Sequence, residues 1–231
     1  MSRSTMALVG SAGPLVQWSW VSSNRGMILS LLWQHVQLTA IAVAVGLAIS
    51  LPLGILAWRV RPLRRPLVGI TGALYVVPSV ALLLLVAPVT GFFSITTAEV
   101  ALVSYTLLIL IRNIIAGLDS VPADVLDAAR GMGYKPLEEL RKVQLPLALP
   151  SILAGVRVAT VTVVGLVNVT AFIGQGGLGQ LIIQGFQSDF NTEIVVGLVL
   201  SVLLAGVADA LIVGAEQLGL PWARSRNAVS R

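Results

Sequence analysis

Long stretches without a charged residue are the feature that most limits how this chain can fold. One such run extends from Leu38 to Ala57 and a second from Leu67 to Val89. A helix needs roughly 20 apolar residues to cross the hydrocarbon core of a bilayer, so each run is long enough to do so. Charged residues are only 11% of the 231, far below the share in an ordinary soluble domain. We therefore expect an all-α chain that spans a membrane several times.

Three further apolar segments contain charges but are still long enough to cross. They cover Ala98–Gly117, about Leu147–Ile173 and Ile194 to about Leu218. We therefore expect about five spans in one membrane domain, residues 28–218. A flexible external tail, residues 1–27, would precede it, and a tail of residues 219–231 would follow it. The short apolar stretch from Met6 to Val16 also resembles a secretion signal faintly, and a tail is the preferred interpretation.

The basic residues predict how the spans are oriented, because Lys and Arg beside a span are retained in the cytoplasm. Most of them lie after the first run, after the third run and in the C-terminal tail; they are Arg59, Arg61, Arg64, Arg65, Arg130, Lys135, Arg141, Lys142, Arg224, Arg226 and Arg231. The linkers 90–97 and 174–193 contain none. This alternation predicts an external N-terminus and a cytoplasmic C-terminus. It also explains the net charge of +5 better than nucleic-acid binding does.

Several kinds of chemistry are excluded by the residues that the chain lacks. It has no cysteine, so disulfides and thiolate metal sites are impossible, and a single histidine, His35, cannot form an imidazole cluster. Neither Lys135 nor Lys142 stands in a Walker A sequence, so this chain has no ATP-hydrolysing site of that type. We expect no metal, cofactor or catalytic residue, and we interpret His35 as a polar residue near an outer helix end.

The linker 119–146 is the longest and most polar segment, and its sequence predicts two short helices. Pro122 suits the first turn of a helix that Gly131 or Gly133 would end. A second helix is expected from Pro136 to about Val143, stopping before Pro146.

The same linker resembles a motif of inner-membrane permeases of ABC importers. That motif is Glu-Ala-Ala, three residues, Gly, nine residues, Ile, one residue and Leu-Pro. Here the matching residues have the same spacing throughout, with Asp in place of Glu and Val in place of Ile: Asp127, Ala128, Ala129, Gly133, Val143, Leu145 and Pro146. The resemblance implies a type I importer permease with a cytoplasmic coupling helix between spans three and four.

The residue types fit a helix that another protein grips. Small side chains at Ala128 and Ala129 would let the helix enter a groove, Gly133 would permit a sharp exit turn, and Asp127 with Arg130 could hold the register. By resemblance, the partner is a cytoplasmic ATPase that binds the ATP and moves this helix. The alternative is a solvated connecting loop with no partner.

A glycine-rich segment after the fourth apolar run resembles permeases for methionine and, more closely, for osmoprotectants. It runs from Phe172 to Gly179 and includes Gly174, Gly176 and Gly177. The segment also satisfies the G-x-G-x-x-G pattern of dinucleotide-binding folds, but that fingerprint must follow a strand inside a βαβ unit. We interpret these glycines as a tight turn or a close helix approach near the outer mouth.

The resemblance covers about residues 30–220 and implies the cargo and the partners. Leu110–Asn113, Ala154–Arg157 and Asp209 agree with the osmoprotectant branch, which imports glycine betaine, carnitine or choline. An external substrate-binding protein, an ATPase and a second permease chain in a bacterial inner membrane would complete the system. A permease for methionine or another small solute is the alternative within the class. An ion-coupled carrier or a membrane enzyme is the alternative outside it.

Charged residues inside the apolar runs need partners, because a charge at the centre of the bilayer costs at least about 2.5–3.5 kcal/mol on insertion scales. Arg157 and Asp209 are expected at about equal depth, roughly 14–15 Å from the inner helix ends, so we predict that they pair. Arg112 lies nearer the inner end and can reach the interface. Together with Asn113 and the four glycines, these residues are the candidates for lining or shaping the translocation route.

Overall fold

The computed structural model describes residues 15–219, which are helical almost throughout and contain no strand. The elements are α1 (Trp18–Ser23), α2 (Arg25–Arg59), α3 (Arg61–Val76), α4 (Ser79–Thr90), α5 (Ile95–Asp119), α6 (Ala123–Gly131), α7 (Pro136–Glu139), η2 (Leu140–Gln144), α8 (Leu145–Thr170), η3 (Ala171–Ile173), α9 (Gly179–Gln187) and α10 (Asn191–Gly219). The expected tail 219–231 lies almost wholly outside the described residues, as do residues 1–14.

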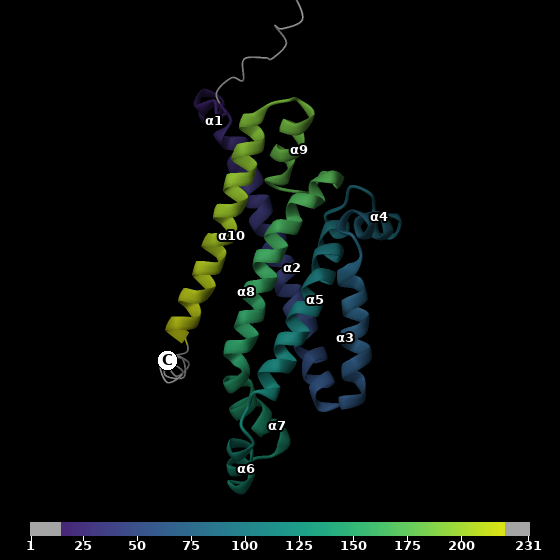
Figure 1. Cartoon of the computed structure of the whole chain (residues 1–231), viewed down its shortest axis with the longest axis vertical. Helices are drawn as coiled ribbons and strands as arrows, with labels where there is room; N and C mark the ends of the chain where they lie inside the picture. The colour runs from purple at the N-terminus through teal and green to yellow at the C-terminus, as the bar shows by residue number, and fades with distance from the viewer. Residues whose placement is uncertain (1–14, 220–231) are drawn as a thin grey trace, which may run out of the picture.

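Four long helical stretches in the described chain are apolar enough to cross a membrane. They are α2, α5, α10 and the continuous stretch Pro136–Ile173, and α3 with α4 makes a fifth if the bent pair counts as one span. They lie along the long axis of the molecule, with α10 on one side of the bundle and α3 on the other (Figure 1). Each predicted apolar run lies within one of these stretches, but α2 already starts at Arg25, well before Leu38, and the fourth stretch starts at Pro136, well before Leu147.

Three helices, α2, α5 and α8, pack closely enough to form the centre of the bundle. A Cβ at Gly46 would lie 1.9 Å from Oγ1 of Thr106, and one at Gly155 would lie 2.5 Å from Cβ of Asn113. Glycine is needed at both contacts because any side chain would push the helices apart. The Asn113 contact joins α5 to α8 where both sequences resemble the permease family.

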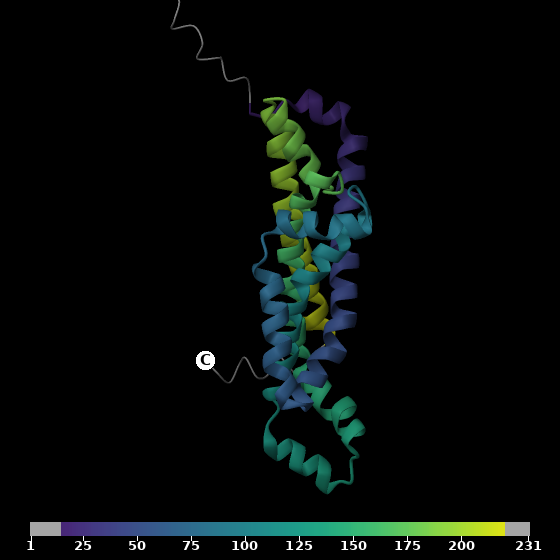
Figure 2. The same ribbon diagram turned by 90° about the vertical axis from the view of Figure 1, so that its right-hand side faces the viewer.

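The second apolar run is not one straight span. α3 and α4 meet at an angle of 101°, and α4 lies across the bundle in Figure 2. Pro78 stands at the corner with φ −56° and ψ 134°, and the Tyr105 hydroxyl donates to the carbonyl oxygen of Val77. A proline lacks an N–H and disfavours helical backbone at the residue before it. Hydropathy could not reveal the corner, because the run has no charge on either side of it.

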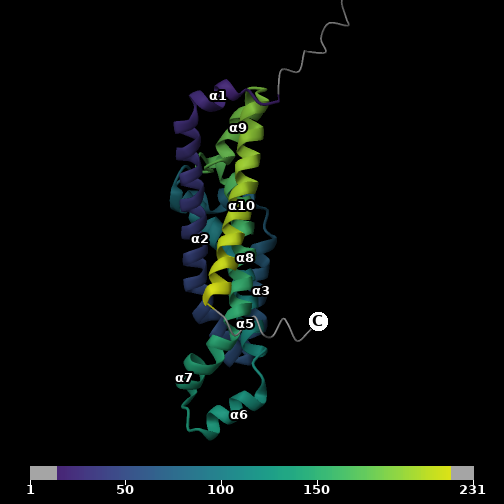
Figure 3. The same cartoon turned by 90° about the vertical axis from the view of Figure 1, so that its left-hand side faces the viewer.

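The first helix begins earlier than the expected boundary at residue 28. α1 is followed directly by α2, which starts at Arg25 and continues for 35 residues. In Figure 3, α1 lies across the end of the molecule, next to α9 and α10. The backbone N–H of Gln17 donates to the Thr192 hydroxyl at 3.0 Å, which ties this region to α10. The prediction of a flexible tail is therefore wrong for residues 17–27.

Candidate functional site

The short helix α6 is the part of the described chain that extends furthest beyond one end of the bundle (Figure 1). It spans Ala123–Gly131, which agrees with the helix predicted over 122–131. Pro122 precedes it with extended backbone, Asp124 lies in its first turn and Arg130 in its last. These charges oppose the partial charges at the two helix ends and stabilise the helix.

The exit from α6 is a glycine-dependent turn. The N–H of Gly133 donates to the Arg130 carbonyl at 2.9 Å, and the N–H of Tyr134 donates to the Ala129 carbonyl at 3.2 Å. This pair of bonds is the Schellman motif, whose central residue has left-handed backbone. Gly133 has φ +85°, a conformation that costs other residues roughly 1–2 kcal/mol. The predicted role of Gly133 as the sharp exit is confirmed.

Only some of the motif residues of α6 face solvent. The side chain of Asp127 is 75% exposed, and Ala128 is also exposed. Ala129, by contrast, is 1% exposed because it packs against the chain itself. The expectation that Ala129 enters a partner's groove is therefore wrong. Met132 is 71% exposed at the helix end, an apolar contact surface that the sequence reasoning missed.

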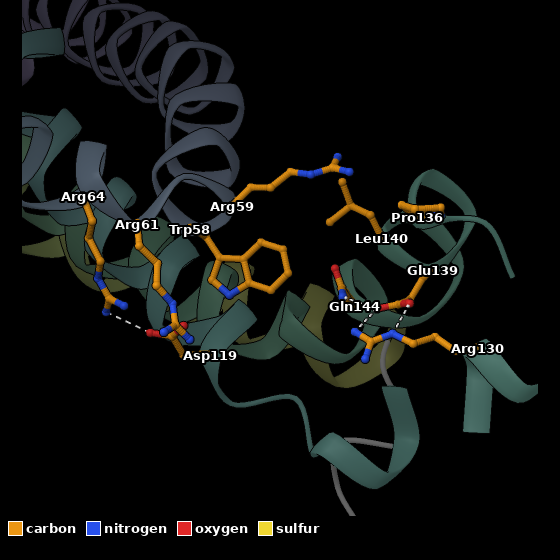
Figure 4. A pocket seen from close by; sticks show the side chains of 10 residues that line it. All are labelled: Trp58, Arg59, Arg61, Arg64, Asp119, Arg130, Pro136, Glu139, Leu140 and Gln144. Atoms are coloured by element: carbon orange, nitrogen blue, oxygen red, sulfur yellow. Dashed lines mark hydrogen bonds and ion pairs between the residues drawn. The ribbon is translucent and has the colours of Figure 1, made fainter. Parts of the chain in front are cut away.

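Arg130 links α6 to the start of the next helical stretch. Its Nη1 donates to Asp127 at 3.3 Å. Its Nε and Nη2 donate to the Glu139 carboxylate at 3.1 and 3.3 Å (Figure 4). The side chain of Gln144 donates to the same Glu139 carboxylate at 2.8 Å. The hydrogen bonds from Arg130 to Glu139, and the negative charge of that carboxylate, raise the pKa of Arg130 further. α6 is thus fastened to α7 and η2.

Glu139 and Gln144 were not singled out in the sequence, although they complete this link. Glu139 resembles an ordinary first-turn acid of a helix, and nothing in the pattern marks it as buried. Its side chain is only 8% exposed, so Arg130 and Gln144 satisfy a carboxylate that water reaches poorly.

The helix that starts at Pro136 does not stop before Pro146. It passes through the π-helical segment η2 and continues as α8, so Pro136–Ile173 is one helical stretch of 38 residues. The N–H of Leu145 bonds the carbonyl of Leu140, and the wider π turn accommodates Pro146, which has no N–H and whose ring crowds the preceding turn. Val143, Leu145 and Pro146 are half-buried at this junction. The predicted stop is wrong because the proline falls in the first turn of α8, where it is tolerated.

A cavity of about 450 Å³ lies between the end of the bundle and the segment around α6. Its lining comes from the α2–α3 corner, from the end of α5 and from α6, α7 and η2; the residues are Trp58, Arg59, Arg61, Arg64, Asp119, Arg130, Pro136, Glu139, Leu140 and Gln144. Arg64, near the start of α3, pairs with Asp119, at the end of α5, at 2.8 Å. In Figure 4, Arg59 extends toward Pro136 and Leu140, whereas Arg61 and Arg64 extend toward Asp119.

The glycine-rich segment forms a tight turn at the opposite end of α8. Gly174 and Gly177 have φ +72° and +49°. A Cβ at Gly177 would lie 2.8 Å from the backbone of His35, and one at Gly179 would lie 2.5 Å from the backbone of Asn168. The turn therefore joins α8 to α2 at a distance that only glycine permits. Gly176 packs as closely on Ala171. This result confirms the tight turn and excludes the βαβ interpretation for this segment.

Three glutamines hold the turn, and the sequence reasoning missed them. Gln175 donates to the Phe93 carbonyl at 3.0 Å, and Gln180 donates to the Gly174 carbonyl at 3.0 Å. Gln34 of α2 bonds both of these side chains at 3.3 Å. The network connects α2, the α4–α5 turn and the glycine turn.

His35 is buried, not interfacial. It is 0% exposed, and its Nε2 lies 3.0 Å from the Val164 carbonyl of α8. The expectation of a polar interfacial residue is therefore wrong, because a contact 129 residues away decides its environment. Within residues 15–219, no group of three or more His, Cys, Asp or Glu side chains is placed to bind a metal ion.

The predicted Arg157–Asp209 pair is present between α8 and α10. Nε and Nη2 of Arg157 donate to the two carboxylate oxygens of Asp209 at 2.8 and 2.9 Å, a bidentate geometry. Arg112 is exposed in the C-terminal half of α5, and its depth in the bilayer stays a prediction. Asn113 donates to the Ile109 carbonyl at 2.8 Å and packs on Gly155, so it serves helix packing.

Comparison with known proteins identifies the fold. Residues 50–215 match the family described as "Binding-protein-dependent transport system inner membrane component". The chain belongs to this family. The matched region contains the whole α6 segment, the glycine turn and the Arg157–Asp209 pair.

The curated relatives of this inner-membrane component are transport permeases. The chain is 36% identical to the osmoprotectant import permease OsmW of Salmonella typhimurium, over 84% of this chain and 92% of that protein. It is 33% identical to the choline transport system permease OpuBB of Bacillus subtilis, over 90% of this chain and 95% of that one. Among solved structures, an inward-facing MetNI methionine ABC transporter chain matches with a TM-score of 0.70 and 25% identity, covering 85% of this chain and 97% of that one.

Breaking the Arg157–Asp209 pair on one side is expected to destabilise the permease more than removing both residues. Arg157→Leu or Asp209→Leu leaves a charge without its partner inside an apolar segment, so we expect a measurable fall in the unfolding temperature. The double variant should recover most of this loss. Thermal unfolding in detergent measures the cycle, and additive losses would contradict a coupled pair.

Proposed function

We propose that this chain is the membrane permease subunit of an ATP-driven importer of osmoprotectants, such as glycine betaine, carnitine, choline or a related quaternary amine. The observation that carries the proposal is the exposed helix α6, which is fastened by Arg130 and Glu139 to a helical stretch crossing the whole bundle. The identity of 36% to an osmoprotectant permease over most of both chains supports the cargo class.

In this mechanism, a separate cytoplasmic ATPase grips the exposed surface formed by Asp127, Ala128 and Met132. The ATPase binds and hydrolyses the ATP, and the permease itself holds no cofactor and does no covalent chemistry. Closure of the ATPase displaces α6, and the Arg130–Glu139 link passes that displacement to α8. Lid and domain closures of this kind occur on microsecond to millisecond timescales.

The outer partner is a substrate-binding protein that docks near the glycine turn. A second permease chain, identical or related, completes the route, because five spans enclose little space alone. The basic residues beside the α2–α3 corner and around α6 support an orientation in which α6 lies in the cytoplasm of a bacterial cell. The N-terminus is then external and the C-terminus cytoplasmic.

Two other functions make different predictions. A methionine permease is favoured by the similarity in fold to the methionine transporter, but the curated relatives that we compared carry osmoprotectant, choline and carnitine names. An ion-coupled carrier would transport solute without any ATPase.

Uptake into proteoliposomes tests the proposal. The permease, the ATPase and the binding protein from the same gene neighbourhood would be reconstituted and supplied with labelled choline, glycine betaine or methionine. We expect uptake of a quaternary amine that requires ATP and all components. ATP-independent uptake by the permease alone would support a carrier, and uptake of methionine alone would reassign the cargo.

The Arg130–Glu139 link yields a prediction for coupling. Glu139→Gln removes the charge that holds Arg130, so we expect uptake per ATP hydrolysed to fall about fivefold. ATPase binding should persist, because Asp127, Ala128 and Met132 keep their exposure. Lys142→Gln is the matched control, since its pair with Glu138 lies on the exposed side and does not touch Arg130. Equal effects of the two substitutions would contradict the proposed link.

A further inference from the structure

The cavity between the α2–α3 corner and the α6 segment has more positive charge than its own acids neutralise. Its lining contains four arginines, Arg59, Arg61, Arg64 and Arg130, and two acids. Asp119 is paired with Arg64, and Glu139 with Arg130. Among the described residues, no acid forms an ion pair with Arg59 or Arg61. The lining of the cavity therefore carries more positive charge than negative charge.

The surroundings of Arg59 and Arg61 combine a polar cavity with an apolar surface. Trp58 lines the cavity, and Val60 and Leu63, next to the two arginines in the chain, are 39% and 42% exposed. Tryptophan and arginine at the end of a membrane span are typical of the level of the lipid headgroups. A ligand at this place would meet charge on one side and hydrocarbon on the other.

We propose that this cavity binds the phosphate group of an anionic phospholipid from the cytoplasmic leaflet. Arg59 and Arg61 supply charge-assisted hydrogen bonds to the phosphate oxygens, and Val60 and Leu63 contact the acyl chains. The shared chemistry with free phosphate is the anion, but the adjoining apolar surface favours the lipid. An acidic side chain of a partner protein is disfavoured, because the cavity lies between α6 and the bundle and not on the exposed surface of Asp127 and Ala128.

The bound lipid would connect two moving parts. One wall of the cavity is the α2–α3 corner, and the opposite wall is Arg130, Pro136, Leu140 and Gln144 of the α6 to η2 segment. A lipid headgroup between these two walls would hold the α6 to η2 segment against the ends of the spans. The inference uses the proposed cytoplasmic placement of α6, but it does not depend on which solute is transported.

Lipid titration of the purified full-length permease tests this site. The delipidated protein in detergent would be titrated with phosphatidylglycerol and, separately, with phosphatidylcholine, and bound lipid would be counted by native mass spectrometry. We expect one tightly retained phosphatidylglycerol per chain. In Arg59→Gln/Arg61→Gln, the affinity should fall by about 20-fold or more, about fivefold for each arginine lost. Arg65→Gln is the matched control, because Arg65 is exposed on the same corner but does not line the cavity.

Three further arms decide among the outcomes. The variant Arg59→Lys/Arg61→Lys keeps both charges and should retain most of the affinity, which separates loss of charge from misfolding. Excess inorganic phosphate should not displace the lipid; complete displacement would overturn the lipid as the occupant. Equal retention of phosphatidylglycerol by the wild type and the double glutamine variant would overturn the site itself. Cysteine labelling at position 61 tests the orientation separately, so a wrong topology is distinguishable from a missing site.

Discussion

Replacing Ala128 by tryptophan is expected to abolish uptake while the permease remains folded. Ala128 is exposed on α6, so a larger side chain can extend into solvent in the chain alone. It would instead collide with the groove of the proposed ATPase. Blocking a central, well-packed contact typically costs 2 kcal/mol or more, so we expect binding of the ATPase to fall by about 30-fold to 100-fold.

The experiment compares three substitutions in the same helix. Ala128→Ser keeps a small side chain and should retain most of the uptake. Ala129→Trp should lower stability as well, because Ala129 is buried in the chain itself. Co-purification of the ATPase, uptake and thermal unfolding are measured for each. Full uptake by Ala128→Trp would show that this surface is not gripped, and the proposed mechanism would then fail.

Substituting Gly177 by leucine is expected to give a large loss of stability. The position has φ +49°, and an added Cβ would lie 2.7–2.8 Å from Cβ, Cα and N of His35. Left-handed backbone costs a branched or bulky residue roughly 1–2 kcal/mol, and separating α2 from the turn adds the loss of packing. Together these effects are expected to exceed about 3 kcal/mol, which is enough to unfold a marginally stable domain.

A control for this substitution lies in α8, outside the glycine turn. Gly165 of α8 has nothing within 4 Å of an added Cβ, so Gly165→Leu should change stability little. Thermal unfolding and the yield of folded protein in detergent compare the two variants. If both variants were similarly stable, the turn and α2 could separate at little cost. The contact with His35 would then not contribute to the stability of the fold.

The spans and the coupling segment could be predicted from the sequence because their signals are local. Uncharged runs of the right length mark spans, and the proline, glycine and acid positions around α6 mark its two ends. The Arg157–Asp209 pair was predictable for a related reason: two opposite charges at equal depth have few other partners in a bilayer.

The errors concern features that hydropathy and residue type do not reveal. His35 is buried because a carbonyl of α8 reaches it, and Ala129 faces inward because α6 folds back toward α7. The corner at Pro78 lies in an uncharged run, so hydropathy carries no sign of it. A proline at position 146 predicts the end of a helix. The helix continues because Pro146 lies in the first turn of α8, directly after the π segment.

The unbroken stretch from Pro136 to Ile173 has a mechanical consequence. At 1.5 Å per residue, its 38 residues extend roughly 57 Å. They reach from the end beside α6, which Arg130 binds, to the glycine turn, which contacts Phe93. The whole stretch is helical, although it contains the π segment η2 and Pro150, so a displacement of one end is expected to move the other end as well. The two ends of this stretch would then move together, so that a change of shape at α6 and a change at the glycine turn form a single event.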